Sequence, residues 1–114
     1  MKLSSALLTA ALILAAPQAF SSERAQVGWQ WIEQGALIID VRTPQEFAQG
    51  HLNNAVNYPL SELDKHFADI DKEAHIVLYC RSGNRSGIAF EHLSAQGFSN
   101  LHNAGGLIEM QNAQ

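Results

Sequence analysis

The sequence predicts an α/β domain in which helices cover both faces of an open parallel sheet. Two apolar runs rich in β-branched residues, ALIIDV over 36–41 and HIVLY over 75–79, are typical of strands buried on both faces. Amphipathic stretches at helical spacing separate and follow these runs, and such alternation indicates parallel βα units. Because parallel sheets bind ligands beyond the carboxyl ends of their strands, Asp40 and Cys80 are expected at one crevice.

The first half of the domain is expected to contain two helices and two strands. Ser22 can cap the first helix, and Gly35 can end it. Val27, Trp31 and Ile32 recur at helical spacing and form its expected apolar face. In chain order, the predicted elements are a helix over 22–34, a strand over 36–41, a helical turn over 44–49 and a strand over 55–58.

The second half is expected to continue the same alternation. Ser61 and Asp64 are predicted to cap the next amphipathic helix. In the helix that follows the second apolar run, Ile88, Ala89 and Leu93 are expected to face inward. The predicted elements are a helix beginning at 61, a strand over 75–79, a helix over 85–96, a weak strand over 99–103 and, after a turn at 105–106, a C-terminal helical turn.

Residues 1–21 are predicted to be a secretory signal peptide rather than part of the fold. Lys2 gives a positive start, and the apolar run over 6–16 is too short to span a bilayer comfortably. Pro17 ends this run, and small residues up to Ser21 favour cleavage after that position. An uncleaved anchor or an amphipathic first helix is the alternative. We therefore expect one domain over 22–114, exported to the periplasm and without a stable membrane anchor after cleavage.

The composition favours a small acidic protein that does not bind nucleic acid. The chain has 114 residues and a formal charge of −4, and it lacks the basic stripe that a nucleic-acid interface needs. The mature part is long enough for one compact domain and no more. A monomer is the default expectation.

Cys80 is the only cysteine of the chain, so no internal disulfide can form. In the oxidising compartment that export implies, an odd thiol is either intermolecular or reactive. The alternative is a buried cysteine that serves as a small hydrophobic residue. The polar loop that follows Cys80 favours the reactive interpretation.

The stretch YCRSGNRSG over 79–87 predicts an anion-binding loop between a strand and a helix. Gly83 permits a sharp turn, and the free amides of the loop and of the helix start can converge on one anion. The helix dipole and the charges of Arg81 and Arg85 add positive potential at the same place. Because all of these favour the thiolate, we expect a lowered pKa for Cys80 and a small anionic substrate.

Other roles are open for the polar residues of this loop. For Ser86, capping of the following helix is the favoured interpretation, and Ser82 is an ordinary turn or cap residue. Asn84 is a plausible turn residue. Arg81 could be a solvated side chain, although its position beside the thiol slightly favours recognition of an anion.

Four stretches of the chain resemble the rhodanese-like sulfurtransferases, in order and at the expected spacings. They are DVRTPQEFAQGHLNNAVNYP over 40–59, CRSGNRS over 80–86, AFEHLSAQGF over 89–98 and NAGGLIEM over 103–110. The resemblance implies a three-layer rhodanese-like domain with a central parallel sheet flanked by helices, and Cys80 as the nucleophile. It implies a persulfide on Cys80, loaded from thiosulfate or a similar small anionic donor and unloaded by cyanide or a thiol acceptor, without metal or cofactor. The implied substrate-binding residues are Arg81, Ser82, Gly83, Asn84, Arg85 and Ser86.

The same resemblance implies mainly architectural roles for Asp40, Arg42, Glu46 and His51. His51 could be imagined as a general base, but a hydrogen-bonding histidine in a turn is the favoured interpretation. Independently of the resemblance, Arg85 could bind a carboxylate such as Glu46 or Asp40, and this is as well supported as a contact with substrate.

Two other functions are compatible with this fold class. Phosphatases and arsenate reductases of the same fold have a C-x5-R loop, whereas Cys80 and Arg85 form a shorter C-x4-R loop. A shorter loop makes a smaller cup, which suits one sulfur atom better than a tetrahedral phosphate. A non-catalytic sulfur-binding or docking module is the remaining alternative.

Overall fold

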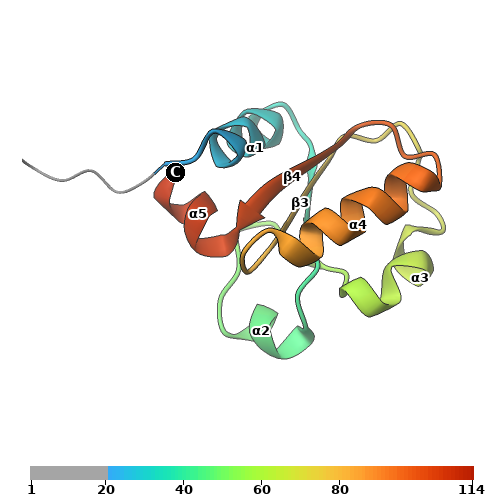
Figure 1. The fold of residues 1–114 in the computed structure, drawn as a ribbon, viewed down its shortest axis with the longest axis horizontal. Helices are drawn as coiled ribbons and strands as arrows, with labels where there is room; N and C mark the ends of the chain where they lie inside the picture. The colour runs from blue at the N-terminus through green and yellow to red at the C-terminus, as the bar shows by residue number, and fades with distance from the viewer. Residues whose placement is uncertain (1–20) are drawn as a thin grey trace, which may run out of the picture.

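The structure, a computed structural model, describes residues 21–114, so all but the last residue of the predicted signal peptide lie outside it. Its strands are hydrogen-bonded in the order β2-β1-β3-β4, and each neighbouring pair is parallel (Figure 1). Within the described residues, no helix combines the length and the apolar character that crossing a bilayer requires. In chain order the elements are α1 (Glu23–Glu33), β1 (Leu37–Asp40), α2 (Pro44–Ala48), β2 (Val56–Asn57), the 3-10 turn η2 (Leu60–Glu62), α3 (Leu63–Phe67), β3 (Ile76–Cys80), α4 (Asn84–Ala95), β4 (Leu101–Gly106) and α5 (Leu107–Asn112).

Two hydrophobic clusters, one on each face of the sheet, hold three layers together. Helices α1 and α5 lie on one face, and α3 and α4 lie on the other (Figure 1). Successive residues of a strand point to opposite faces, so Val77 and Tyr79 of β3 belong to the first cluster. Ile76, Leu78 and Cys80 belong to the second. Every residue of β3 is buried, and the predicted fold class is confirmed.

The helix cap predicted at Ser22 is confirmed. Its hydroxyl oxygen accepts a hydrogen bond from the Ala25 amide in the first turn of α1. The predicted apolar face of this helix is only half-buried, because α1 meets the sheet through smaller residues. A Cβ atom on Gly28 would lie 2.8 Å from the Ala104 side chain, so glycine lets α1 pack closely against β4.

Two predictions for the second half are wrong. Ser61 and Asp64 form no helix cap, because the chain first makes the turn η2 and α3 begins only at Leu63, without a side-chain cap. Ile88, predicted to face inward, is 51% exposed. The face of α4 that meets the sheet is centred on Ala89, which is fully buried. This face is too narrow to include Ile88, the residue before Ala89.

Strand β4 extends beyond the predicted strand over 99–103 and contains an irregularity. Leu78 pairs with Asn103, but Cys80 pairs with Gly106, so β4 holds one extra residue between these two pairs. Bulges of this kind re-aim side chains and are common next to functional sites. The glycine pair at 105–106, predicted as a turn after the strand, instead forms the end of β4 beside Cys80.

Candidate active site

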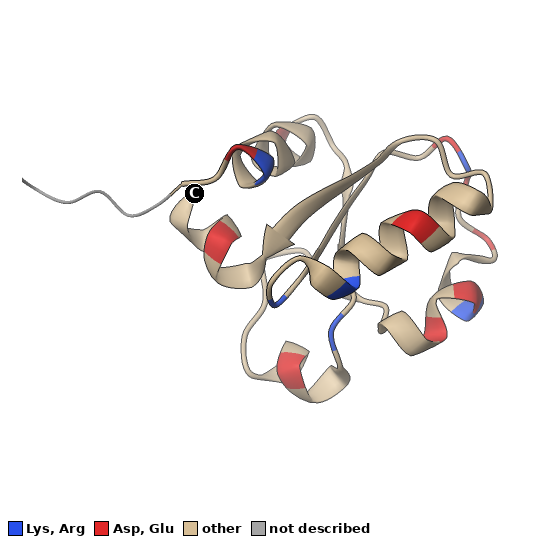
Figure 2. Cartoon of the chain, in the orientation of Figure 1, with Lys and Arg blue, Asp and Glu red and all other residues tan. Residues whose placement is uncertain are grey.

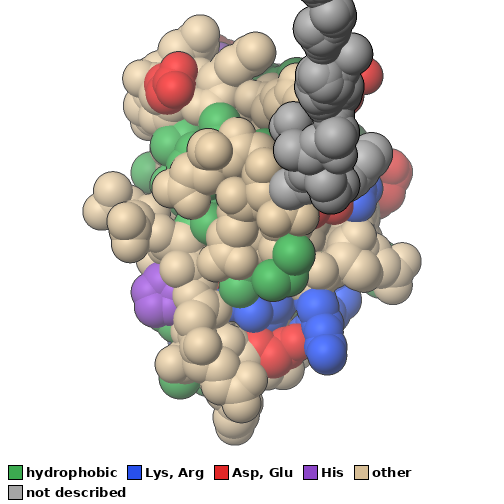
Figure 3. All heavy atoms as spheres, turned by 90° about the vertical axis from the view of Figure 1, so that its left-hand side faces the viewer, with side chains coloured by type: hydrophobic (Ala, Val, Ile, Leu, Met, Phe, Trp, Pro, Cys, Tyr) green, Lys and Arg blue, Asp and Glu red, His purple; other side chains and the backbone are tan. Residues whose placement is uncertain are grey.

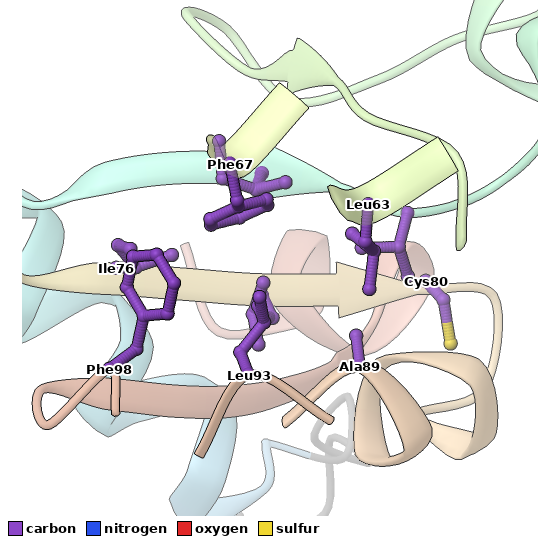
Figure 4. Packing of buried hydrophobic residues seen from close by; sticks show 10 residues of the cluster. Leu63, Phe67, Ile76, Cys80, Ala89, Leu93 and Phe98 are labelled. Carbon is purple, nitrogen blue, oxygen red and sulfur yellow. The ribbon is translucent and has the colours of Figure 1, made fainter. Parts of the chain in front are cut away.

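Cys80 lies at the carboxyl end of β3, where the strand enters the loop that leads to α4. The residue is fully buried and belongs to the hydrophobic cluster between the sheet and α3 and α4. Figure 4 shows its sulfur at the edge of this cluster, directed away from the other labelled side chains. The sulfur accepts hydrogen bonds from the Gly83 amide at 3.0 Å, the Ser86 amide at 3.4 Å and the Ser86 hydroxyl at 3.3 Å. The predicted amides that converge on the thiol are therefore present.

The surroundings of Cys80 change its acidity in two opposite directions. Burial raises the pKa of the thiol, because a buried thiolate loses its hydration. Hydrogen bonds from the Ser86 hydroxyl and from the amides of Ser86, Ser82 and Gly83 favour the thiolate and outweigh burial. The pKa of Cys80 is therefore lower than that of an ordinary thiol, as the sequence predicts.

The prediction that Ser86 caps α4 is wrong. The cap position belongs to Gly83, which has a left-handed backbone with φ of 98°, and Ser86 lies inside the first turn of the helix. Its fully buried hydroxyl lies 2.7 Å from Oδ1 of Asn103 and 3.3 Å from the sulfur of Cys80. Because a hydroxyl carries one hydrogen, Ser86 can donate to either of these acceptors but not to both at once.

Arg85 forms the ion pair that the sequence offers as one alternative, and its partner is Glu46 rather than Asp40. Its two terminal nitrogens bind the two carboxylate oxygens at 2.8 and 2.9 Å. Figure 2 shows α2, which carries an acidic residue, below the basic start of α4. The hydrogen bonds from Arg85, and then those from Thr43, lower the pKa of Glu46 to about 2. This ion pair connects α2 to the loop that surrounds Cys80.

The other residues predicted to be architectural, Asp40, Arg42 and His51, contact one another or the backbone between β1 and β2. Asp40 and Arg42 form a buried ion pair at 2.6 Å, and Arg42 also donates to the Gly50 carbonyl at 2.7 Å. His51 places Nδ1 at 2.8 Å from the Phe47 carbonyl and stacks its ring on Phe47 at 3.6 Å between centroids. These contacts fix the segment between β1 and β2.

The outer part of the loop is exposed to solvent. Arg81, Ser82 and Asn84 all have exposed side chains, and Asn84 begins α4. Figure 3 shows basic side chains gathered around an acidic one on this face, with hydrophobic atoms directly beside them. A shallow hollow of about 290 Å³ is lined by Arg42, Glu46, Gln49, Arg81, Leu107 and Ile108.

The glycine pair at the end of β4 makes room for the loop. A Cβ atom on Gly106 would collide with the Arg81 carbonyl. A Cβ atom on Gly105 would lie 2.6 Å from Nε of Arg24 and would also collide with Glu109. The absence of side chains at these positions therefore lets the loop and the Arg24–Glu109 ion pair approach β4.

Two residues at the site were not predicted from the sequence. Asn103 of β4 donates from Nδ2 to the Gly83 carbonyl at 3.1 Å and, through Oδ1, accepts from the Ser86 hydroxyl. Arg24 of α1 donates to the Ser82 carbonyl at 3.0 Å. Neither residue belongs to the loop, and a polar residue in a weak strand or on an exposed helix gives no local signal of such contacts.

The comparisons with known proteins agree with this geometry. A family model described as rhodanese-like domain matches residues 25–113. The chain is 42% identical over 71 residues to thiosulfate sulfurtransferase PspE of Escherichia coli, covering 60% of this chain and 68% of that protein. It is 33% identical over 79 residues to thiosulfate sulfurtransferase GlpE of Ectopseudomonas mendocina, covering 69% and 72% of the two chains. A solved structure described as rhodanese with anions from E. coli matches with a TM-score of 0.61 and 39% identity, over 66% of this chain and 91% of that one.

The parallel sheet and the hydrogen-bonded cysteine at its carboxyl edge both lie within the residues that the family model matches. The chain belongs to the rhodanese-like domain family, and its relatives include proteins named thiosulfate sulfurtransferase.

Proposed function

We propose that the protein is a thiosulfate sulfurtransferase that carries sulfur as a persulfide on Cys80. The observation that carries this proposal is the convergence of the Gly83 and Ser86 amides on one sulfur atom, with the Ser86 hydroxyl in place as a further donor. Fixed donors around a sulfur stabilise a thiolate, and they stabilise an anionic sulfur attached to it in the same way. The names of the PspE and GlpE relatives, both thiosulfate sulfurtransferases, support thiosulfate as the donor.

In the first step the Cys80 thiolate attacks the outer sulfur of thiosulfate. A bond forms between the two sulfurs, the bond to the sulfonate sulfur breaks, and its electron pair leaves with sulfite. The negative charge then rests on the terminal sulfur of the persulfide. No electrons are gained or lost overall, and neither a metal ion nor an organic cofactor is required.

The burial of Cys80 defines how the donor must reach it. Because the cysteine has no exposed surface, thiosulfate must approach it from the side of the exposed rim, which Arg81 and Ser82 form. Arg81 then provides a positive charge for the sulfonate end, which stays outside. Arg85 is held by Glu46 and acts on the loop rather than on the donor.

In the second step cyanide or a thiol attacks the terminal sulfur of the persulfide. The bond between the two sulfurs breaks, and its electron pair returns to Cys80 as the thiolate. Cys80 is the only cysteine of the chain, so no second cysteine of the same chain can take the sulfur. The acceptor is therefore an external molecule, and the predicted export signal is the reason to place this reaction in the periplasm.

Mass spectrometry of the purified protein after thiosulfate treatment tests this function. We expect a gain of about 32 Da, one sulfur atom, that disappears on addition of cyanide with release of thiocyanate. The Cys80→Ser variant should show neither the gain in mass nor turnover. The same spectrum reports the mature N-terminus and so tests the predicted cleavage after Ser21.

Two results would overturn the proposal. Turnover of thiosulfate by the Cys80→Ser variant at the wild-type rate would exclude a persulfide on this residue. Hydrolysis of p-nitrophenyl phosphate without any sulfur loading would instead support a phosphatase of the same fold.

A further inference from the structure

The side chain of Arg24 lies against the outside of the Cys80 loop, although it belongs to α1. Its Nη2 donates to the Ser82 carbonyl at 3.0 Å, between residues 58 positions apart in the sequence. A Cβ atom on Gly83 would lie 2.7 Å from the same nitrogen, so the guanidinium occupies the space directly above this glycine. The loop is therefore covered from outside by a residue of another element.

Arg24 and the sulfur of Cys80 bind opposite sides of one peptide group. This group joins Ser82 to Gly83: its carbonyl accepts from Arg24, and its N–H donates to the sulfur at 3.0 Å. In a planar trans peptide the C=O and the N–H point in opposite directions, so fixing one fixes the other. Gly83 has a φ of 98°, and glycine tolerates many backbone angles, so the orientation of this peptide needs an external restraint.

Glu109 of α5 holds Arg24 in this position. Two guanidinium nitrogens of Arg24 donate to its carboxylate at 2.7 and 2.9 Å, and the hydroxyl of Ser22 and the amide of Gly106 donate to the same group. The hydrogen bonds from Arg24 first, and then those from Ser22 and Gly106, lower the pKa of Glu109 to about 2 despite its partial burial. The ion pair is therefore intact wherever a thiol titrates.

We propose that Arg24 is a positioning residue of the sulfur-transfer site: by holding the Ser82 carbonyl, it aims the Gly83 amide at the sulfur of Cys80. Arg24 itself touches no reacting atom. The inference rests on the proposed function for its activity readout, but the acidity of the thiol tests it independently.

The test is a pH titration of the Cys80 thiolate, followed by its absorbance at about 240 nm with the Cys80→Ser variant as baseline. In Arg24→Ala the Gly83 amide loses its restraint. We expect the thiolate fraction below the midpoint of the titration to fall about tenfold, the effect of weakening one hydrogen bond to a charged group. The rate of persulfide formation should fall in parallel. Arg24→Lys should restore part of both.

Two further variants separate orientation from charge. Lys65→Ala removes an exposed cation of α3 that is paired with Glu62 rather than with Glu109. It makes the same change in net charge and should leave the thiol titration unaltered. Glu109→Gln keeps the charge of Arg24 but removes the anion that holds it. If Arg24 acts through its charge alone, Glu109→Gln raises the thiolate fraction, because a negative charge has been removed. If Arg24 orients the peptide, the thiolate fraction falls.

The results distinguish a failure of this inference from a failure of the proposed function. If the wild type loads sulfur and Arg24→Ala titrates like the wild type, Arg24 has no positioning role. If Glu109→Gln increases the thiolate fraction, the role of Arg24 is electrostatic and the inference is equally wrong. If the wild type forms no persulfide, the proposed function fails, while the titrations still decide how Arg24 acts. Because 43% of the Arg24 side chain is exposed, the variant should fold, and its circular dichroism checks this.

Discussion

The segment from Arg81 to Ser86, which joins β3 to the first turn of α4, contains the dipeptide Arg-Ser twice, and the two copies have opposite surroundings. Arg81 and Ser82 both have exposed side chains on the rim of the loop. In the second copy, both terminal nitrogens of the Arg85 guanidinium bind the carboxylate of Glu46. Ser86 is fully buried, and its hydroxyl lies beside the sulfur of Cys80. Gly83 separates the copies, because its positive φ reverses the chain and begins the helix.

The difference shows that position relative to this turn, rather than residue type, decides what each side chain does. The copy before the turn faces solvent, where we propose that Arg81 meets the substrate. The copy in the first turn of α4 faces β3 on one side and α2 on the other, so it serves the sulfur and the framework. The predictions below test this division of roles.

The largest loss of sulfur-transfer activity is expected from the variant Ser86→Ala. The hydroxyl of Ser86 lowers the pKa of Cys80, so removing it raises this pKa, and the thiolate forms only at higher pH. At a pH below the titration midpoint, sulfur loading should slow about tenfold. Ser82→Ala is the matched control, since its exposed hydroxyl has no contact with the sulfur, and it should barely change the thiol titration. Equal shifts of the thiol titration in the two variants would show that Ser82 and Ser86 have the same role, which would contradict this division.

A smaller effect is expected from Arg81→Ala. Because Arg81 is exposed at the rim, its removal should raise KM for thiosulfate about fivefold while the thiol titration stays unchanged, as for a surface charge that meets an anionic substrate. Steady-state kinetics at two ionic strengths measure this, and added salt should weaken the wild type more than the variant. A shift of the thiol titration without a change in KM would contradict this role, because it would show that Arg81 acts on the Cys80 thiolate instead.

The smallest effect is expected from Glu46→Gln, which removes the charge that binds Arg85 but retains a capping residue for α2. The pKa of Glu46 is about 2 in the folded protein, below its value in the unfolded chain. The ion pair therefore contributes stability above pH 4 to 5, and this contribution is lost as the pH falls toward 2. Denaturant unfolding should show a loss of about 1 kcal/mol at neutral pH that shrinks in acid. A loss that is independent of pH would contradict the assignment.

Much of the fold and the position of Cys80 could be predicted from the sequence, because their signals are local. The apolar runs that form β1 and β3 indicate buried parallel strands, and the residue after such a run lies at the binding edge of the sheet. The lowered pKa of the thiol also follows from loop composition, since a tight turn before a helix leaves amides free to bind an anion.

The remaining features depend on contacts between distant segments. The local pattern predicts the wrong role for Ser86, because a serine near a helix start resembles a cap until the backbone of Gly83 is known. Arg24 and Asn103 contact the loop because α1 and β4 pack beside it in the folded chain. No spacing in the sequence predicts these contacts. The exposure of Ile88 likewise depends on how α4 is rotated on the sheet.

The central claim is that the main chain after Tyr79 directs hydrogen-bond donors at one buried sulfur, and the amide resonances of the loop test it most directly. In a pH titration followed by nuclear magnetic resonance, the amide protons of Gly83 and Ser86 should shift together. Their common midpoint should lie below about 8.5, the ordinary thiol value, and the shifts should vanish in Cys80→Ser. Amides that do not respond to the thiol, or a midpoint at or above the ordinary value, would contradict the account.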